Sequence, residues 1–250
     1  MKKNTMFVVV GIIIIVLVIG YFMTRGSSNN VVTNQPTTTN TTGVTKTPPV
    51  VKDNSVDVIG KSVEGRDITA YHYGTGPLEL LFIGGIHGGY EWNTVLVAYQ
   101  MMEYLKANPS AIPANLKVTV IPVLNPDGLN KIVGTTGVFT QADVPAKLAD
   151  TVAGRFNGNN VDLGRNFDCD WQANAKWQTN NVSGGTSAFS EPESQAIKNY
   201  TSTHKLSAVV TWYSSAGGVF ASSCHNGVST ETNAITKAFA KASGYPAYES

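Results

Sequence analysis

Apolar residues are spaced in three different ways along this chain. Residues 7–23 form an apolar run without a charge, residues 78–83 and 118–124 form short, mainly apolar runs, and residues 92–105 carry apolar side chains at helical spacing. A long unbroken run is typical of a membrane span, a short run of a buried strand, and helical spacing of an amphipathic helix. The pattern therefore predicts an N-terminal apolar segment followed by a domain of strands and helices.

Turn and capping residues add further elements to this pattern. Residues 56–73 predict two short strands around a Glu-Gly-Arg turn, and the Asn-Pro-Asp-Gly segment at 125–128 predicts a turn. A capping box with Pro in its first turn predicts a helix over residues 190–203. Residues 208–213 then predict an apolar strand, and residues 231–243 another helix.

Apolar strands that alternate with helices indicate an α/β fold. We expect a mixed, mostly parallel central sheet flanked by helices. In such sheets, ligands bind beyond the C-terminal ends of the strands. His87, Asn125 and the segment 213–218 each follow a predicted strand, which makes this edge the expected site.

The first apolar run predicts a single-pass membrane anchor. Its 17 residues, 7–23, would cover about 25 Å of the roughly 30 Å hydrocarbon core of a lipid bilayer. Lys2 and Lys3 precede the run and only Arg25 follows closely, so we expect a cytoplasmic N-terminus and an extracytoplasmic domain. A buried soluble helix and a cleaved signal peptide are the alternatives.

Composition divides the chain into three parts. Residues 1–25 are the predicted anchor, residues 26–53 a flexible linker of Ser, Thr, Asn and Pro, and residues 54–250 a single α/β domain that we expect to be incomplete at its C-terminus. Five basic residues and no acidic residue lie in 1–52, which leaves thirteen basic against seventeen acidic residues, a net charge of −4. This balance excludes a basic nucleic-acid-binding domain.

A glycine turn places two potential zinc ligands close together. In His87-Gly88-Gly89-Tyr90-Glu91, an imidazole and a carboxylate flank the turn, and both groups bind zinc. Glycines let such a loop fold back on itself. The alternative is that His87 and Glu91 are solvated neighbours without a metal.

Two arginines follow in the second half of the chain. Arg155 and Arg165 are the only arginines after Arg66. Guanidinium groups bind carboxylates through paired hydrogen bonds, as a substrate with a free carboxylate would require. The alternative is that each arginine pairs with a nearby aspartate, Asp162 or Asp168.

These residues belong to five segments that lie in order over residues 56–220: Ile59-Gly60-Lys61-Ser62-Val63-Glu64-Gly65-Arg66, Gly84-Gly85-Ile86-His87-Gly88 with Glu91-Trp92, Asn125-Pro126-Asp127-Gly128, Val161-Asp162-Leu163-Gly164-Arg165-Asn166-Phe167, and Phe189-Ser190-Glu191-Pro192-Glu193. Together they resemble the zinc carboxypeptidases of the carboxypeptidase A type. The resemblance implies an α/β fold, a single zinc ion that activates water, and a metallocarboxypeptidase that acts on peptide substrates with a free C-terminal carboxylate.

The resemblance also implies a role for each candidate residue. His87 and Glu91 look like the first two zinc ligands, and Arg155 looks like the catalytic arginine that polarises the scissile carbonyl. Arg165 resembles the arginine that binds the terminal carboxylate of the substrate. Asp162 is expected to orient the loop.

The chain departs from the family pattern at four points. Three residues separate His87 from Glu91 where the family has two, and Gly164 stands where the family has an Asn. The third zinc ligand, a His, falls on Tyr213, whose neutral phenol is a poor ligand. The glutamate that serves as general base belongs to a later strand that we do not find before Ser250, so the activity of this chain is in doubt.

Two remaining features leave alternatives open. His225 could replace the third ligand if residues 217–220 form a strand that returns it to the cleft, although this is not the favoured interpretation. Cys169 and Cys224 are the only cysteines, and an extracytoplasmic location favours a disulfide between them over two buried free thiols.

Three functions are compatible with these residues. The favoured one is a zinc carboxypeptidase-like hydrolase that removes C-terminal residues from peptides, including cell-wall peptides, at the outer face of a membrane. The first alternative is an inactive peptide-binding or cell-wall-binding module on the same fold. The second is an amidohydrolase that cleaves N-acyl amino acids.

Overall fold

The structure, a computed structural model, describes residues 55–249. The predicted membrane anchor (residues 7–23) and linker (26–53) lie outside these residues. Among residues 55–249, no helix is both long and apolar enough to cross a membrane.

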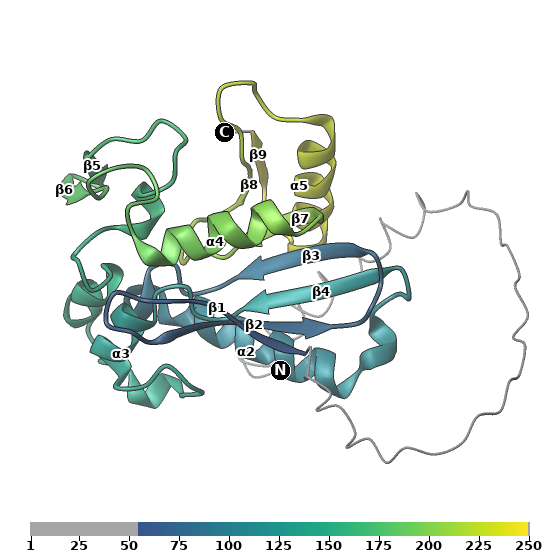
Figure 1. The fold of residues 1–250 in the computed structure, drawn as a ribbon, viewed down its shortest axis with the longest axis horizontal. Helices are drawn as coiled ribbons and strands as arrows, with labels where there is room; N and C mark the ends of the chain where they lie inside the picture. The colour runs from purple at the N-terminus through teal and green to yellow at the C-terminus, as the bar shows by residue number, and fades with distance from the viewer. Residues whose placement is uncertain (1–54, 250) are drawn as a thin grey trace, which may run out of the picture.

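A five-stranded mixed sheet forms the centre of the domain, with the order β1-β2-β4-β3-β7 (Figure 1). Its strands are β1 (Val56–Lys61), β2 (Asp67–Tyr73), β3 (Leu78–Ile83), β4 (Leu116–Ile121) and β7 (Leu206–Thr211). The pairs β1–β2 and β2–β4 are antiparallel, whereas β3 runs parallel to both β4 and β7. The expected mixed sheet is confirmed, but "mostly parallel" is wrong, because the short turn between β1 and β2 makes that pair a hairpin.

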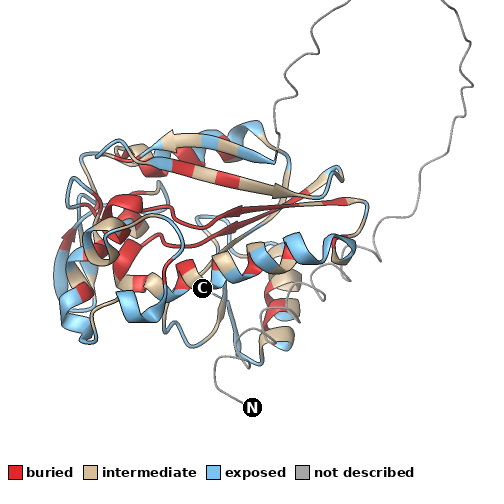
Figure 2. Ribbon diagram, turned by 90° about the horizontal axis from the view of Figure 1, so that it is seen from below, coloured by how far each residue is buried: buried red, intermediate tan, exposed pale blue. Residues whose placement is uncertain are grey.

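Helices cover both faces of the sheet (Figure 1). The helices α2 (Trp92–Ala107) and α5 (Thr230–Ser243) lie on one face and α4 (Pro192–Thr203) on the other, whereas α3 (Pro126–Val133) packs against residues 88–91 and 148–155 beyond the sheet. Leu80 packs with residues of α2 and α5, whereas its neighbour Leu81 packs with residues of α4 on the opposite face. Successive side chains of a strand point to opposite faces, so a strand covered on both sides is mostly apolar; the one buried charge of β3, Glu79, pairs with Lys117. Figure 2 shows this burial along the central strands.

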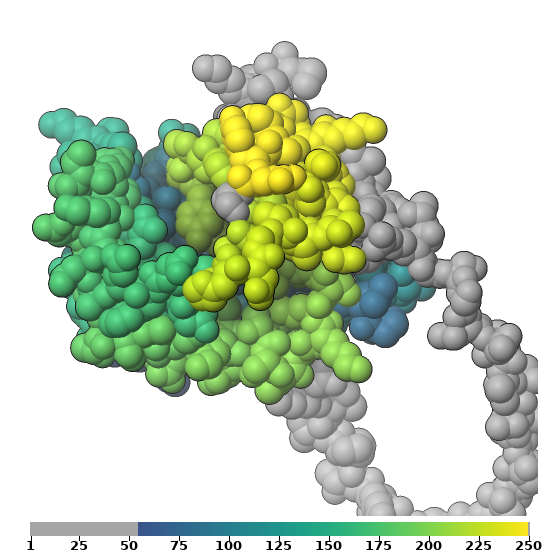
Figure 3. All heavy atoms as spheres, turned by 90° about the horizontal axis from the view of Figure 1, so that it is seen from above, coloured from purple at the N-terminus to yellow at the C-terminus, as the bar shows by residue number. Residues whose placement is uncertain are grey.

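Smaller elements surround the sheet. They are the 3-10 helices η1 (Gly88–Glu91), η2 (Pro109–Ala111), η3 (Gln141–Asp143), η4 (Leu148–Arg155) and η5 (Leu163–Arg165), the antiparallel pair β5 (Asn174–Trp177) and β6 (Asn180–Ser183), and the parallel pair β8 (Val219–Ala221) and β9 (Ala247–Glu249). The β5–β6 hairpin and the β8–β9–α5 unit rise from the same side of the sheet (Figure 1). The surface is hollowed between these two parts (Figure 3).

Two local predictions were wrong. The segment predicted as a turn at 125–128 begins α3, because the side chain of Asn125 accepts a hydrogen bond from the Gly128 amide at 2.8 Å and Pro126 occupies the first helical turn. The capping box at Ser190 does not form. The Ser190 hydroxyl donates to Glu191 Oε1 at 2.8 Å, and the N-cap of α4, Glu191, makes no side-chain cap.

The predicted disulfide is confirmed. Cys169 and Cys224, 55 positions apart, are bonded to each other. The bond connects the loop after η5 to the segment after β8, two parts of the chain that are distant in sequence.

Candidate active site

The turn after β3 brings His87 and Glu91 together. Both side chains are buried, and Nδ1 of His87 lies 3.0 Å from Oε1 of Glu91. The residues between them form η1, which has His87 at its N-cap and ends at Glu91. A Cβ on Gly88, whose φ is +44°, would lie 2.7 Å from backbone atoms of Gly154 and Leu129. Glycine at this position therefore allows the close packing that holds the turn.

Two atoms of this pair have no hydrogen-bond partner. They are Nδ1 of His87 and Oε2 of Glu91, both buried. The short distance between the two side chains therefore does not have the geometry of a hydrogen bond. Buried polar atoms without a hydrogen bond destabilise a folded protein, so their presence here requires an explanation. Either an additional proton on the imidazole or a divalent cation would compensate for the carboxylate here.

Asp162 connects this pair to Arg155. Its Oδ1 lies 3.1 Å from Nε2 of His87, and its Oδ2 accepts a hydrogen bond from Nε of Arg155 at 2.8 Å. Burial alone would raise the pKa of Asp162, but His87 and Arg155 outweigh this effect and lower it. Burial alone would lower the pKa of His87, but the carboxylates of Asp162 and Glu91 raise it. The aspartate thus fixes the orientation of both the imidazole and the guanidinium.

The two predicted arginines have different environments. Arg155 is buried at the end of η4, and its NH1 atom lies 3.9 Å from Oε1 of Glu91. Arg165, at the end of η5, is exposed. The structure therefore brings His87, Glu91 and Arg155 together. Arg155 also pairs with Asp162, which was the alternative interpretation of this arginine. A place in the site and an ion pair with Asp162 are therefore compatible.

Tyr213 lies beside the metal-binding candidates. Its ring centroid is 5.7 Å from that of His87. Burial of the hydroxyl, followed by the charges of Glu91 and Asp162, raises the pKa of Tyr213 to about 12, although 45% of the residue is exposed. The positive charge of Arg165 has the opposite effect and lowers the pKa of Tyr213. The phenol is therefore neutral near pH 7.

Gly164 has a steric role in this site. A Cβ at this position would lie 2.9 Å from Nε2 of His87 and 3.3 Å from Oδ1 of Asp162. An asparagine, as the family pattern has it, would displace the imidazole from Asp162. The departure from the family pattern is thus consistent with the observed His87–Asp162 contact.

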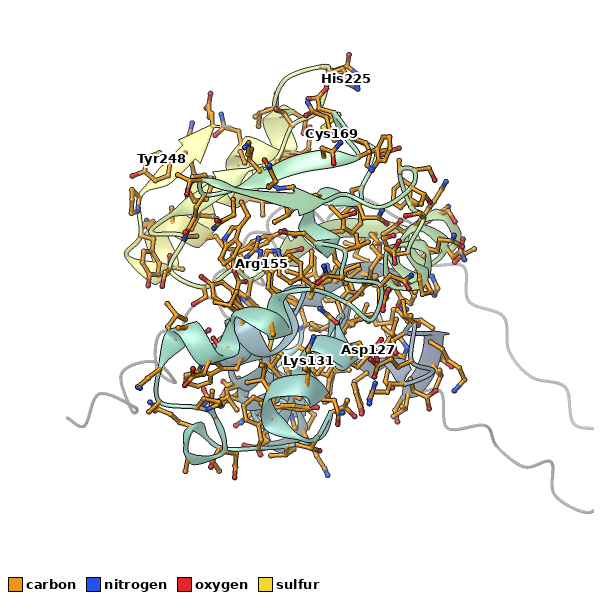
Figure 4. All side chains as sticks on the ribbon, turned by 90° about the vertical axis from the view of Figure 1, so that its left-hand side faces the viewer. Asp127, Lys131, Arg155, Cys169, His225 and Tyr248 are labelled. Carbon is orange, nitrogen blue, oxygen red and sulfur yellow. A yellow bond between two sulfur atoms is a disulfide. The ribbon has the colours of Figure 1, made fainter. Side chains whose placement is uncertain are left out.

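His225 does not belong to the site. Its side chain is 70% exposed and lies 3.7 Å from Asp170. It lies near Cys169 at one extremity of the molecule, whereas Arg155 lies near the centre (Figure 4). Within residues 55–249, no group of three or more His, Cys, Asp or Glu side chains is arranged to hold a metal ion.

Other family-like segments support the site without contributing chemistry. Asp127 accepts hydrogen bonds from the hydroxyl of Ser62 at 2.6 Å and from Arg66 at 2.8 Å, which joins the first and third matching segments. Glu191 and Glu193 both accept from Nδ2 of Asn157, two residues after Arg155. The two contacts of Asn157 fix the loop that carries Arg155.

Sequence reasoning missed two aromatic residues near Arg155. The guanidinium carbon lies 4.4 Å from the ring centroid of Trp177 and 5.5 Å from that of Tyr90. Tyr90 stands inside the His87 turn, which was a usable signal. Trp177 lies in a segment without apolar periodicity, so no local signal indicated it.

Comparison with known proteins identifies the family. The zinc carboxypeptidase family model matches residues 49–246. This chain belongs to the zinc carboxypeptidase family. It is 31% identical to carboxypeptidase Z of Rattus norvegicus and 30% identical to that of Homo sapiens, in each case over 122 residues. These matches cover 44% of this chain and 17% of the relatives.

A solved carboxypeptidase A structure shares the fold. Carboxypeptidase A from Helicoverpa armigera superimposes with a TM-score of 0.58 at 23% identity. The match covers 74% of this chain and 47% of that structure. The α/β architecture with a mixed central sheet is therefore the carboxypeptidase fold, over about half of the length of that relative.

The zinc that this family requires fits two of the residues present. Nδ1 of His87 and Oε2 of Glu91 are donors suited to zinc, and both lack a partner inside the protein. Tyr213, at the position expected for the third ligand, is a neutral phenol. The described residues thus provide two atoms that can bind zinc, whereas the position expected for the third ligand carries no suitable donor atom.

Proposed function

We propose that this protein is a zinc-dependent carboxypeptidase-type hydrolase that removes C-terminal residues from peptides. The observation that carries the proposal is the buried pair of unpartnered atoms on His87 and Glu91, with Arg155 beside it. Family membership supports the same reaction class. When bound, zinc would supply a Lewis acid that lowers the pKa of a coordinated water.

The chain's own residues would bind and orient the substrate. Asp162 holds the imidazole of His87 through Nε2, which leaves Nδ1 free for the metal. Arg155 offers N–H groups to the scissile carbonyl oxygen as negative charge develops there. Arg165, which is exposed, would bind the terminal carboxylate of the peptide.

Zinc content and peptide hydrolysis test this function. Purified protein should retain zinc and release single C-terminal residues from a short peptide. His87→Ala and Glu91→Gln should lose both properties. The matched controls are His225→Ala, since His225 is exposed far from the site, and Glu103→Gln, on the exposed face of α2. Wild-type protein without zinc and without hydrolysis would refute the proposal.

A second candidate is a peptide-binding module that does not cleave. The observation in its favour is that the described residues hold no group of three potential metal ligands. Such a module would bind a peptide carboxylate through Arg165 and retain it intact. Calorimetry with a peptide and with its C-terminal amide separates the two functions, because only the hydrolase would also release products. An N-acyl amino acid amidohydrolase would instead cleave an N-acyl amino acid offered as the substrate in a separate hydrolysis assay.

We further propose an extracytoplasmic location on a single-pass anchor. The apolar run at 7–23 and the preceding lysines support a membrane span with a cytoplasmic N-terminus. The Cys169–Cys224 disulfide supports an oxidising compartment. Cell-wall peptides are then accessible substrates. Membrane fractionation and protease digestion of intact cells should find the domain on the outer face, and a soluble cytoplasmic protein would contradict this.

A further inference from the structure

The guanidinium of Arg155 is enclosed by aromatic rings as well as by carboxylates. Its central carbon lies 4.4 Å from the ring centroid of Trp177 and 5.5 Å from that of Tyr90. The two rings meet edge to face, with centroids 5.1 Å apart and an interplanar angle of 79°. Phe156 also contacts Trp177 edge to face, with centroids 6.4 Å apart. Trp177 is thus the ring with contacts to all members of this cluster.

The β5–β6 hairpin carries Trp177 to this position. Trp177 pairs with Asn180 at the end of the hairpin next to its turn. The opposite end is fixed to the segment that bears Asp162, because the Asp162 amide donates to the Ser183 carbonyl at 3.0 Å. The same segment therefore holds Arg155 from two directions, through the carboxylate of Asp162 and through the ring of Trp177.

This arrangement restricts the orientation of the guanidinium. The hydrogen bond from Nε to Asp162 fixes one edge, but it still permits the plane to rotate about that edge. A ring stacked on one face opposes this rotation. A cation on an aromatic face is held more strongly where water is excluded, and Arg155 is only 5% exposed. The NH1 atom is consequently kept on the side of Glu91, 3.9 Å from Oε1.

We propose that Trp177 is a positioning residue that holds the Arg155 guanidinium in its orientation beside the His87–Glu91 pair. The positional role rests on the contacts alone. Its consequence for hydrolysis rests on the proposed function. Two experiments are therefore needed, and the first does not depend on activity.

The first experiment measures the chemical accessibility of Arg155. Phenylglyoxal modifies accessible guanidinium groups, and peptide mass spectrometry gives the modification rate of each arginine. We expect Trp177→Ala to increase the rate at Arg155 about tenfold and Trp177→Phe to leave it near that of the wild type. Arg165 is exposed and provides an internal control. An unchanged Arg155 rate in Trp177→Ala, or equal rates for Arg155 and Arg165 in the wild type, would overturn the proposal.

The second experiment measures peptide hydrolysis. Trp177→Ala should lower kcat about tenfold and change KM less than twofold, because the arginine would act on charge that develops in the transition state. Trp177→Phe should recover most of kcat, and Trp177→Ala should add no loss to Arg155→Met. A loss of kcat that Phe does not restore, with the melting temperature lowered equally in both variants, would indicate a merely structural role and overturn the proposal. Wild-type protein without hydrolysis would refute the proposed function, and the labelling rates would then decide the role of Trp177.

Discussion

Oδ1 of Asp162 lies 3.1 Å from Nε2 of His87, a contact between residues 75 positions apart. The other oxygen of the same carboxylate binds Arg155. The imidazole and the guanidinium are thereby oriented by a single acid that is fully buried. A carboxylate behind a histidine fixes its tautomer and leaves the other ring nitrogen available to a metal.

Asp162→Asn should weaken zinc binding and the fold together. The amide has one acceptor oxygen where the carboxylate accepts from both His87 and Arg155, so one partner loses its hydrogen bond. The amide is also neutral, so the buried guanidinium of Arg155 loses its charge compensation. We expect zinc affinity to fall about 10-fold to 100-fold and the free energy of unfolding to fall by about 3–5 kcal/mol. Competitive titration with a zinc indicator and urea denaturation measure these effects. Asp168→Asn, on the exposed part of the same loop, is the control, and an equal loss there would contradict the assignment.

Tyr213→His should strengthen zinc binding. Tyr213 lies beside His87, with ring centroids 5.7 Å apart, and its pKa is raised to about 12, so it provides no anionic donor near pH 7. An imidazole at this position would provide a third donor. We expect at least a tenfold gain in affinity, measured by the same titration. Tyr213→Phe is the control, because it removes the phenol hydroxyl without adding an imidazole. A similar gain in zinc affinity in Tyr213→His and Tyr213→Phe would argue against a third-ligand position.

Removal of the disulfide should destabilise the domain. The bond links residues 55 positions apart, for which the chain-entropy relation gives about 4 kcal/mol. The Cys169→Ala/Cys224→Ala double variant should unfold at correspondingly lower urea concentration. Wild-type protein in reducing agent should behave like the variant. If the reduced wild type stays more stable than the variant, the disulfide contributes less to the free energy of unfolding than the loop-closure relation gives.

The folded protein favours the neutral form of His72, so its stability should fall as the pH is lowered. Burial lowers the pKa of His72, and Lys117 adds to this effect, although Asp57 opposes it. The unfolded chain, with a histidine pKa near about 6.5, therefore binds this proton more readily than the folded protein does. The neutral imidazole of His72 therefore adds to the free energy of unfolding above the pKa of the unfolded chain. This contribution is lost as the pH falls through the lower pKa of the folded protein.

His72→Gln should remove this contribution. The free energy of unfolding of the variant should vary less between about pH 7 and pH 5 than that of the wild type. Denaturant titrations at several pH values measure the difference. His225→Gln, at an exposed surface position, is the control. Parallel curves for wild type and His72→Gln would show that another group dominates.

Local sequence patterns predicted the central elements well. The apolar run at 78–83 coincides with β3, because this strand is buried on both faces and local hydrophobicity alone identifies it. The helical spacing at 92–105 likewise predicted α2. The segment at 125–128 was misread, since Asn-Pro-Asp-Gly suits both a turn and a capped helix start, and the residues after Gly128 decide between the two.

The amino-acid sequence by itself determined the α/β architecture and the types of side chain near the strand ends, because periodicity and turn chemistry are local properties. Only the tertiary structure decided that Asp162 joins His87 to Arg155, that His225 lies on a distant surface, and that Trp177 covers the guanidinium. These relations depend on how loops from separate parts of the chain pack against one another. Residue spacing along the chain carries no direct record of such long-range contacts.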